Sequence, residues 1–435
     1  MATDGRPAGA GSLRLLGANR PFRLLWSARA VSFLGDSLGL VALMLHVAGT
    51  TGQALAVAAL LLAGDFAPAL LGPLTGTVAD RLDRRRVMVG CELVQGALVV
   101  AIALWLPSLP LPLLLVLVGL RAVAGQVFQP ASRAAVPAVV GERDLERANA
   151  AVGVATNGGE ALGPLVAAVA LPVLGVRGVL LVDAASFLVS AALLGRLPAL
   201  TGPTRGPRSS FLADAAGGLR YLRGQAVVRV VALGYFAVVA CTGIDDVALV
   251  FLATSTFGTG AAAVGLLLAA VGIGLLAGYA LLARTAGRRA APRTPPIVRG
   301  TTPAAAPRTP PATGLLLAGF AVSSAGNLLT GLAWAVAAAF AVQAVRGLGI
   351  AAMDVAATTL VQRTVPAELQ GRVFGSLYGG IGVAAALSYL LGGLLLDRTS
   401  PRVAFVAAGA AGLLATGATA LALRRAVHRS YRDRR

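Results

Sequence analysis

Two long apolar segments of the chain are joined by the stretch Gly72-Pro73-Leu74-Thr75-Gly76-Thr77-Val78-Ala79-Asp80-Arg81-Leu82-Asp83-Arg84-Arg85-Arg86. The stretch passes from small apolar side chains to a cluster of arginines, as happens where a membrane-spanning helix meets a basic loop. The apolar segments on either side are long enough to cross a bilayer as helices, which takes about 20 residues. We therefore expect a loop at the membrane surface between two spans.

The composition of the whole chain agrees with this interpretation. Of its 435 residues, 57% are hydrophobic and only 13% are charged, whereas about a quarter of the residues of a soluble domain are charged. The sequence predicts an all-α integral membrane protein with twelve transmembrane helices. We place the spans at roughly 22–48, 54–79, 86–106, 111–139, 147–174, 178–198, 227–254, 261–283, 313–331, 334–362, 370–396 and 401–423.

The formal net charge of +19 comes from arginines that gather in alternate connections. The clusters lie at 81–86, 205–223, 284–308 and 424–435, while the other connections carry little charge. Positive charge stays on the cytoplasmic side of a membrane. This pattern predicts cytoplasmic termini and a multi-pass protein of the bacterial inner (plasma) membrane, and we expect no nucleic-acid partner.

The chain also carries a weak internal repeat, which predicts two pseudo-symmetric six-helix bundles. Arg346 follows Arg121, and Arg402 follows Arg177, at the same interval of 225 residues. Transporters often build a central site at the interface of such repeats. The predicted parts are a cytoplasmic tail (1–21), the first bundle (22–198), a cytoplasmic linker (199–226), the second bundle (227–423) with a disordered cytoplasmic loop (285–312), and a basic tail (424–435).

The opening stretch resembles the signature loop of the major facilitator superfamily, G-x-x-x-D-R-x-G-R-R. Gly76, Asp80, Arg81 and Arg84 match the pattern, and Asp83 stands where the family has Gly. A small residue at position 76 lets neighbouring helices approach closely. The resemblance implies that Asp80 and Arg84 latch the two halves in one gating state.

Two further stretches resemble the exporter branch of this family. Gly159-x-x-x-Gly163-Pro164 in the fifth span is similar to its antiporter motif, and residues 365–374 are similar to the enterobactin-exporter-like and macrolide-efflux-like branches. Gly and Pro at these positions let a helix bend and pack closely, and we expect them to face the other half. The branch resemblance implies export.

Several charged residues fall inside predicted spans, where each needs a partner or a wet cavity. Each half places an acid on its first helix and an arginine on its fourth, and in this superfamily these helices line the central cavity. A protonatable carboxylate beside an arginine suits proton coupling, but a static buried ion pair is the alternative. The candidates for proton coupling and cavity lining are Asp36, Arg121, Glu160, Asp245, Asp246 and Arg346. Glu92 and Asp183 lie near predicted span ends, and we expect both to be solvated at the interface.

Together these features predict a secondary active transporter. We expect it to export a small amphipathic compound (a drug, siderophore or other secondary metabolite) by proton antiport with alternating access. An importer or lipid-type facilitator on the same scaffold is the alternative, and a non-transporting receptor would not need the buried charges. With two His and no metalloprotease, nucleophile-elbow or phosphate-loop motif, the chain is not expected to be an enzyme. We expect a monomer whose partners are the substrate and the lipid bilayer, with a proton gradient and no cofactor.

Overall fold

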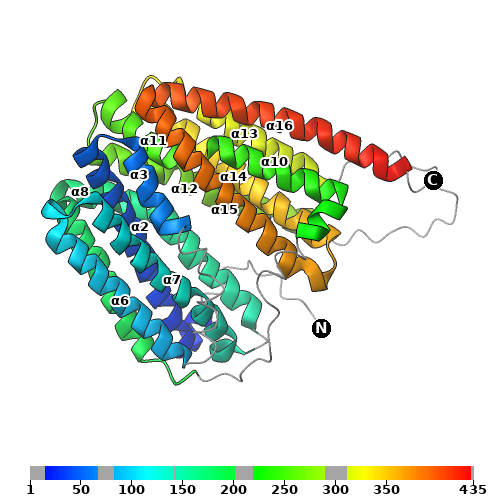
Figure 1. Cartoon of the computed structure of the whole chain (residues 1–435). Helices are drawn as coiled ribbons and strands as arrows, with labels where there is room; N and C mark the ends of the chain where they lie inside the picture. Colours follow the sequence, from blue (N-terminus) through cyan, green and yellow to red (C-terminus); the bar gives the residue numbers. More distant parts are fainter. Residues whose placement is uncertain (1–14, 67–82, 142–143, 201–218, 290–310, 433–435) are drawn as a thin grey trace. The chain divides into compact units, whose positions relative to one another are not determined.

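The computed structural model describes residues 15–66, 83–141, 144–200, 219–289 and 311–432. The secondary structure of these residues is helical (Figure 1). Within these ranges there is no strand, in agreement with the predicted all-α class. The helices are α2 (Arg20–Thr51), α3 (Ala54–Leu61), η1 (Leu62–Phe66), α6 (Arg84–Trp105), η2 (Leu106–Ser108), α7 (Leu111–Val140), α8 (Leu145–Gly195), α10 (Ala226–Thr242), α11 (Asp245–Phe251), η4 (Leu252–Thr256), α12 (Ala261–Arg289), α13 (Pro311–Gly331), α14 (Val336–Thr364), α15 (Ala367–Arg398) and α16 (Pro401–Arg432).

Ten of the described helices are long and apolar enough to cross a membrane. One of them, α8, contains two of the predicted spans, because its backbone is not helical at Gly175 (φ 64°, ψ 177°). A straight helix of this length would extend roughly 76 Å. Instead, Gly163 lies against Ser37 of α2, and Asp183 lies against Gly39, only two residues further along the same helix. The chain therefore reverses at Gly175, and α8 consists of two antiparallel helices.

The second predicted span, 54–79, is described only as far as Phe66. Its first part is the apolar helix α3, which continues into η1. The described residues therefore fit the twelve predicted spans without establishing their number.

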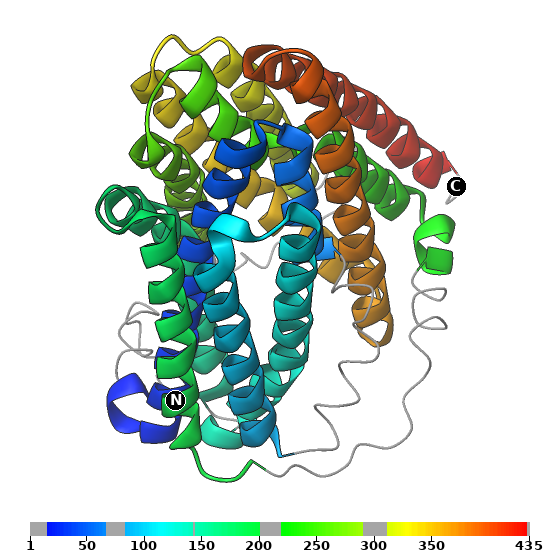
Figure 2. The ribbon, with the colours of Figure 1, turned by 60° about the vertical axis from the view of Figure 1, so that its left-hand side comes forward.

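The chain divides into two compact units. Unit 1 comprises Met1–Ser209, Asp246–Ala269 and Tyr389–Pro401, and unit 2 comprises Ser210–Asp245, Ala270–Ser388 and Arg402–Arg435. In unit 1, α2 packs against α8, and α6 contacts both α7 and α8; Figure 2 shows α6 and α7 side by side, joined by η2. In unit 2, α13 packs against α14. The boundaries of the predicted bundles stay a prediction.

Local sequence sets the ends of the helices that carry the site. The Asn19 side chain accepts a hydrogen bond from the Phe22 amide (2.9 Å) and caps α2, with Pro21 in its first turn. Gly52 ends α2 in the left-handed conformation (φ 65°) that favours glycine. α2 thus runs uninterrupted past all the polar residues that it contributes to the site.

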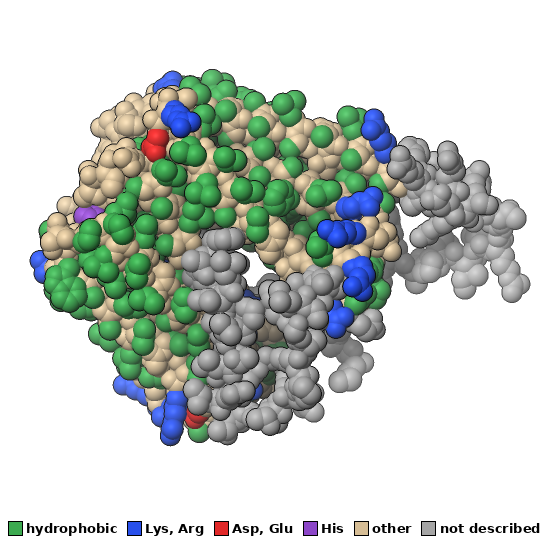
Figure 3. Space-filling view, viewed as in Figure 1, with side chains coloured by type: hydrophobic (Ala, Val, Ile, Leu, Met, Phe, Trp, Pro, Cys, Tyr) green, Lys and Arg blue, Asp and Glu red, His purple; other side chains and the backbone are tan. Residues whose placement is uncertain are grey.

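The surface suits a lipid environment. Large hydrophobic side chains are exposed on most of the long helices, with Val173 and Leu414 at 80% and 76%, and it is their number that a soluble protein does not show. Hydrophobic side chains cover much of the face in Figure 3, and the basic side chains lie toward its margins. Lipid chains would solvate these side chains as well as a protein interior does.

Candidate functional site

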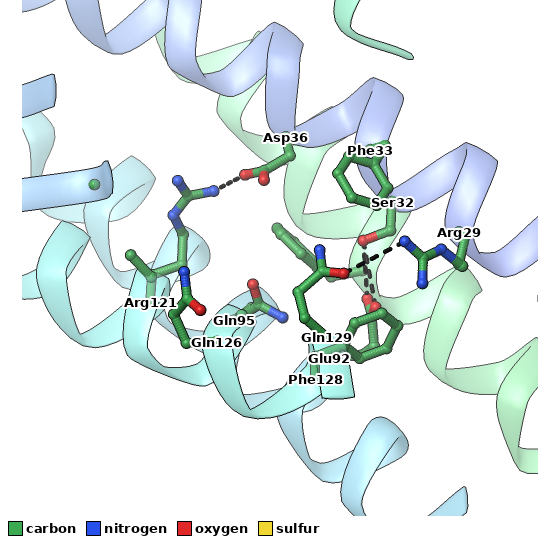
Figure 4. A pocket seen from close by; sticks show the side chains of 14 residues that line it. Arg29, Ser32, Phe33, Asp36, Glu92, Gln95, Arg121, Gln126, Phe128 and Gln129 are labelled. Atoms are coloured by element: carbon green, nitrogen blue, oxygen red, sulfur yellow. Dashed lines mark hydrogen bonds and ion pairs between the residues drawn. The ribbon is translucent and has the colours of Figure 1, made fainter. Parts of the chain in front are cut away.

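A cavity of about 230 Å³ lies within unit 1, and residues of α2, η1, α6, α7 and α8 line it. Its walls combine three aromatic rings with the amides of Gln95, Gln126 and Gln129 and with four charged side chains. Figure 4 shows these side chains converging from the surrounding helices. The rings belong to Phe33, Phe128 and Phe187, and the charged residues are Arg29, Asp36, Glu92 and Arg121.

Asp36 of α2 and Arg121 of α7 form an ion pair that borders this cavity. The Arg121 side chain is 11% exposed and the Asp36 side chain is 38% exposed, so the carboxylate is the more open partner. The sequence predicts that these two residues face each other, and the structure brings them together. Pairing reduces the cost of placing both charges among apolar helices.

Arg29 is the second arginine at the cavity, and the hydrogen-bond partners of its guanidinium are neutral groups. It donates hydrogen bonds to the Ser132 hydroxyl (2.5 Å) and to the Gln129 carbonyl oxygen (3.4 Å). Its guanidinium carbon lies 5.4 Å from the centre of the Phe33 ring, a cation–π distance. Sequence reasoning missed Arg29 because the residue lies close to the start of the first predicted span, where an arginine usually reaches the interface.

Glu92 and Asp183 are not solvated at the interface, so that prediction was wrong. Glu92 on α6 is completely buried, and the Ser32 hydroxyl lies 3.3 and 3.2 Å from its two carboxylate oxygens. Asp183 is also buried, with its carboxylate against Gly35 and Gly39 of α2. Glycines on α2 leave room for this acid, and hydropathy alone does not reveal such a contact.

Unit 2 holds a second buried ion pair, between Asp245 and Arg346. Arg346 also donates to the Gln343 side-chain oxygen (3.3 Å), and the Gln343 amide donates to the Thr330 hydroxyl (3.1 Å). The internal repeat predicts this acid and this arginine on matching helices of the second half. Asp246, the neighbouring candidate, is half-buried.

Another polar cluster of unit 2 is centred on Asp354 of α14. The hydroxyls of Tyr235 and Tyr279 each donate to one of its carboxylate oxygens at 2.9 Å. Tyr235 belongs to α10 and Tyr279 to α12, so one carboxylate joins three helices. No local sequence signal links these residues, which lie 119 and 75 positions from Asp354.

The antiporter-like motif packs mainly on α2. A methyl group at Gly163 would overlap the Ser37 side chain, and one at Gly159 would lie 3.0 Å from the Phe33 Cβ atom. The buried Pro164 lies next to Gly265 of α12, so this stretch also meets a segment of the second predicted bundle within unit 1. The α8 backbone at Glu160 is described, but the Glu160 side chain lies outside the described part.

The signature loop is described only from residue 83 onward, and Gly76, Asp80 and Arg81 lie outside the described residues. Arg84 donates to the Ala134 carbonyl of α7 (3.2 Å). Asp83, where the family pattern has Gly, caps α6 by accepting from the Arg85 amide (2.9 Å). Among the residues that the structure describes, no group of three His, Cys, Asp or Glu side chains is placed to hold a metal ion.

Comparisons with known proteins agree with these features. The model of the Major Facilitator Superfamily matches residues 25–307 and 308–435. The MFS-type transporter YfiS of Bacillus subtilis is 25% identical over 398 residues, which cover 88% of this chain and 89% of YfiS. The macrolide efflux protein A of Streptococcus pyogenes is 23% identical over 206 residues, which cover 46% of this chain and 51% of that protein.

Solved structures share the fold at low sequence identity. The nucleoside transporter NupG has a TM-score of 0.73 and 11% identity, with 92% of this chain and 98% of NupG covered. A bacterial homologue of the iron transporter ferroportin, in an inward-facing state, has a TM-score of 0.69 and 16% identity, with 93% and 98% covered. The match to the family along nearly the whole chain, together with the apolar helices, identifies the protein as a membrane transporter, not an enzyme, that belongs to the major facilitator superfamily and resembles its macrolide-efflux branch.

Proposed function

We propose that this transporter exports a small amphipathic compound in exchange for protons, by alternating access, across the bacterial inner membrane. The observation that carries the proposal is the Asp36–Arg121 ion pair at the cavity of unit 1. A half-open carboxylate beside an arginine, between apolar helices, offers a group whose charge a proton can cancel. In this proposal both termini are cytoplasmic, the protein acts as a monomer, and the proton gradient replaces any cofactor.

The walls of the cavity support an amphipathic substrate. The rings of Phe33, Phe128 and Phe187 provide apolar surface, and the neighbouring glutamine amides provide a few hydrogen-bonding groups. Sites for small molecules typically combine largely apolar walls with a small number of polar anchors. The similarity to proteins named for macrolide efflux supports export of a partly apolar compound.

In this proposal, proton binding is coupled to transport because Asp36 binds either Arg121 or a proton. A proton on this carboxyl removes the charge that holds Arg121, so protonation and the ion pair compete. If the contact differs between the two access states, the proton affinity of Asp36 differs as well, and this difference couples the movement of protons down their gradient to the exchange. A static ion pair would keep Asp36 charged throughout the cycle and would only hold α2 to α7.

Replacing Asp36 by Asn distinguishes these two roles. We expect Asp36→Asn, reconstituted in proteoliposomes, to lose pH-gradient-driven transport of erythromycin while it retains part of the downhill exchange. Asp36→Glu, which keeps a titratable carboxyl, is the matched control and should retain driven transport. Full driven transport by Asp36→Asn would contradict the coupling role. Erythromycin uptake in place of efflux by energised cells would contradict the direction.

A further inference from the structure

We propose that Glu92 is a second proton-binding site of this transporter, distinct from the Asp36–Arg121 pair. The proposal rests on the proposed proton exchange and adds a residue to it. Glu92 is completely buried, yet it lies at the wall of the same cavity. Figure 4 shows its carboxylate beside Ser32 of α2, close to the ring of Phe128 and away from the Asp36–Arg121 pair.

The partner of Glu92 differs in kind from the partner of Asp36. Arg121 is a permanent cation that only donates hydrogen bonds, so its contact suits only the ionised form of Asp36. The Ser32 hydroxyl lies 3.3 and 3.2 Å from the two Glu92 oxygens. A hydroxyl donates to a carboxylate and accepts from a carboxylic acid. Glu92 can therefore gain or lose a proton while this contact persists, whereas Asp36 must first leave Arg121.

The surrounding charges leave Glu92 available for this role. In the part of the chain described, no cation lies within 4.0 Å of its carboxylate. Arg29 is engaged with the Ser132 hydroxyl and the Gln129 amide, and Arg121 is paired with Asp36. The charged or titratable groups that act directly on Glu92 are Arg29 on α2, Cys91 on α6 and Asp183 on α8. Asp36 and Arg121 line the same cavity further away (Figure 4), and Arg133 of α7 acts on Arg29.

A proton on Glu92 changes the net charge of the cavity. With Asp36, Arg121 and Arg29 ionised, the cavity is neutral when Glu92 is ionised and carries one positive charge when Glu92 is protonated. A charge at the wall of a cavity between apolar helices acts more strongly on a charged substrate than the same charge in bulk water does. The two states of Glu92 thus present two different electrostatic sites to the same substrate.

Infrared difference spectroscopy tests the site without a substrate. The full-length protein in lipid bilayers is compared between an acidic and an alkaline buffer, and protonated carboxyls are read from their C=O stretching band. Glu92→Gln keeps the size of the side chain and a partner for Ser32 but cannot ionise. We expect it to lose one component of the band. Asp36→Asn should keep that component. An unchanged band in Glu92→Gln, or its loss in Asp36→Asn instead, would overturn the proposal.

Ser32→Ala provides a second variant should Glu92→Gln not fold, because it leaves the carboxyl in place. We expect the pH midpoint of the Glu92 component to shift, and Ser32→Thr, which keeps the hydroxyl, to restore it. An unchanged midpoint in Ser32→Ala would refute the role given to the hydroxyl.

Transport separates this inference from the proposed function. In proteoliposomes loaded with a pH dye, we expect Glu92→Gln to move one proton fewer per erythromycin than the wild type. An unchanged proton-to-erythromycin ratio contradicts the proposal for Glu92. A wild type that moves no protons with the probe contradicts the proposed exchange itself, while the infrared band still reports on Glu92.

Discussion

The carboxylate of Asp397, near the end of α15, caps the start of α3, which lies 343 residues earlier in the chain. Its two oxygens accept hydrogen bonds from the backbone amides of Ala54 (2.6 Å) and Leu55 (3.1 Å). Gln53, at the N-cap position of α3, makes no side-chain cap of its own. The first amides of a helix have no partner within the helix. Asp397 therefore supplies from a distant segment what the local sequence lacks.

The size of the effect follows from this geometry. Losing an N-terminal cap costs about 0.5–2 kcal/mol, and losing a negative charge beside the positive end of a helix costs about 0.3–1 kcal/mol. Asp397→Ala should therefore lower the local stability of the first turn of α3 by about 1–2 kcal/mol, which corresponds to about 5–30-fold more frequent opening. Asp397→Asn keeps an oxygen acceptor without the charge and should show an intermediate effect.

Hydrogen–deuterium exchange of the peptide covering α3 measures this opening directly. We expect faster exchange at the first amides of α3 in Asp397→Ala. The matched control is Asp83→Ala, which removes the cap of α6 and should accelerate exchange there without affecting α3. Wild-type exchange at α3 in Asp397→Ala would refute the capping argument, and equal acceleration of all helices would point to a general loss of stability.

Two further predictions concern packing and the second ion pair. Gly163→Ala places a methyl group against the Ser37 side chain and should destabilise the protein by about 1–3 kcal/mol, whereas Gly158→Ala, which has open space on the same helix, should not. Thermal unfolding of the two purified variants compares them, and equal melting temperatures would contradict the close approach of α8 to α2. Asp245→Asn leaves the buried Arg346 without its counter-charge and should lower the free energy of unfolding by about 3–5 kcal/mol, while Asp245→Glu should retain much of the stability. A melting temperature of Asp245→Asn equal to that of the wild type would mean that the pair contributes little to stability.

Much of the fold could be predicted because apolar length and charge distribution fix the spans directly. The predicted gap between 174 and 178 contains Gly175, where the backbone reverses. The Asp36–Arg121 and Asp245–Arg346 contacts could also be inferred from the sequence, because a charge in an apolar span needs a partner and few opposite charges lie at a similar depth.

The positions of Glu92 and Asp183 could not be predicted because they depend on contacts between helices. Glu92 lies about two turns into α6, close enough to the span boundary to suggest interfacial solvation, but its side chain points toward Ser32. Asp183 is buried because Gly35 and Gly39 make room for it. Hydropathy indicates the depth of a residue in the membrane only to within a few positions. It does not indicate which helix lies next to a given side chain.

α2 connects these observations, because two of its faces serve different purposes. Arg29, Ser32 and Asp36 follow one another at intervals of three and four residues, so they share the face that lines the cavity. Gly35 and Gly39, four residues apart, share the face that lies against Asp183 of α8. Each titratable group near the cavity therefore meets a different partner: Arg121 holds Asp36, neutral groups hold Arg29, and a hydroxyl holds Glu92. Of the two acids at the cavity, only Glu92 has a contact that accommodates both charge states, so in the proposed exchange we expect a change in proton concentration to act on Glu92 without breaking an ion pair, whereas protonation of Asp36 removes its pairing with Arg121.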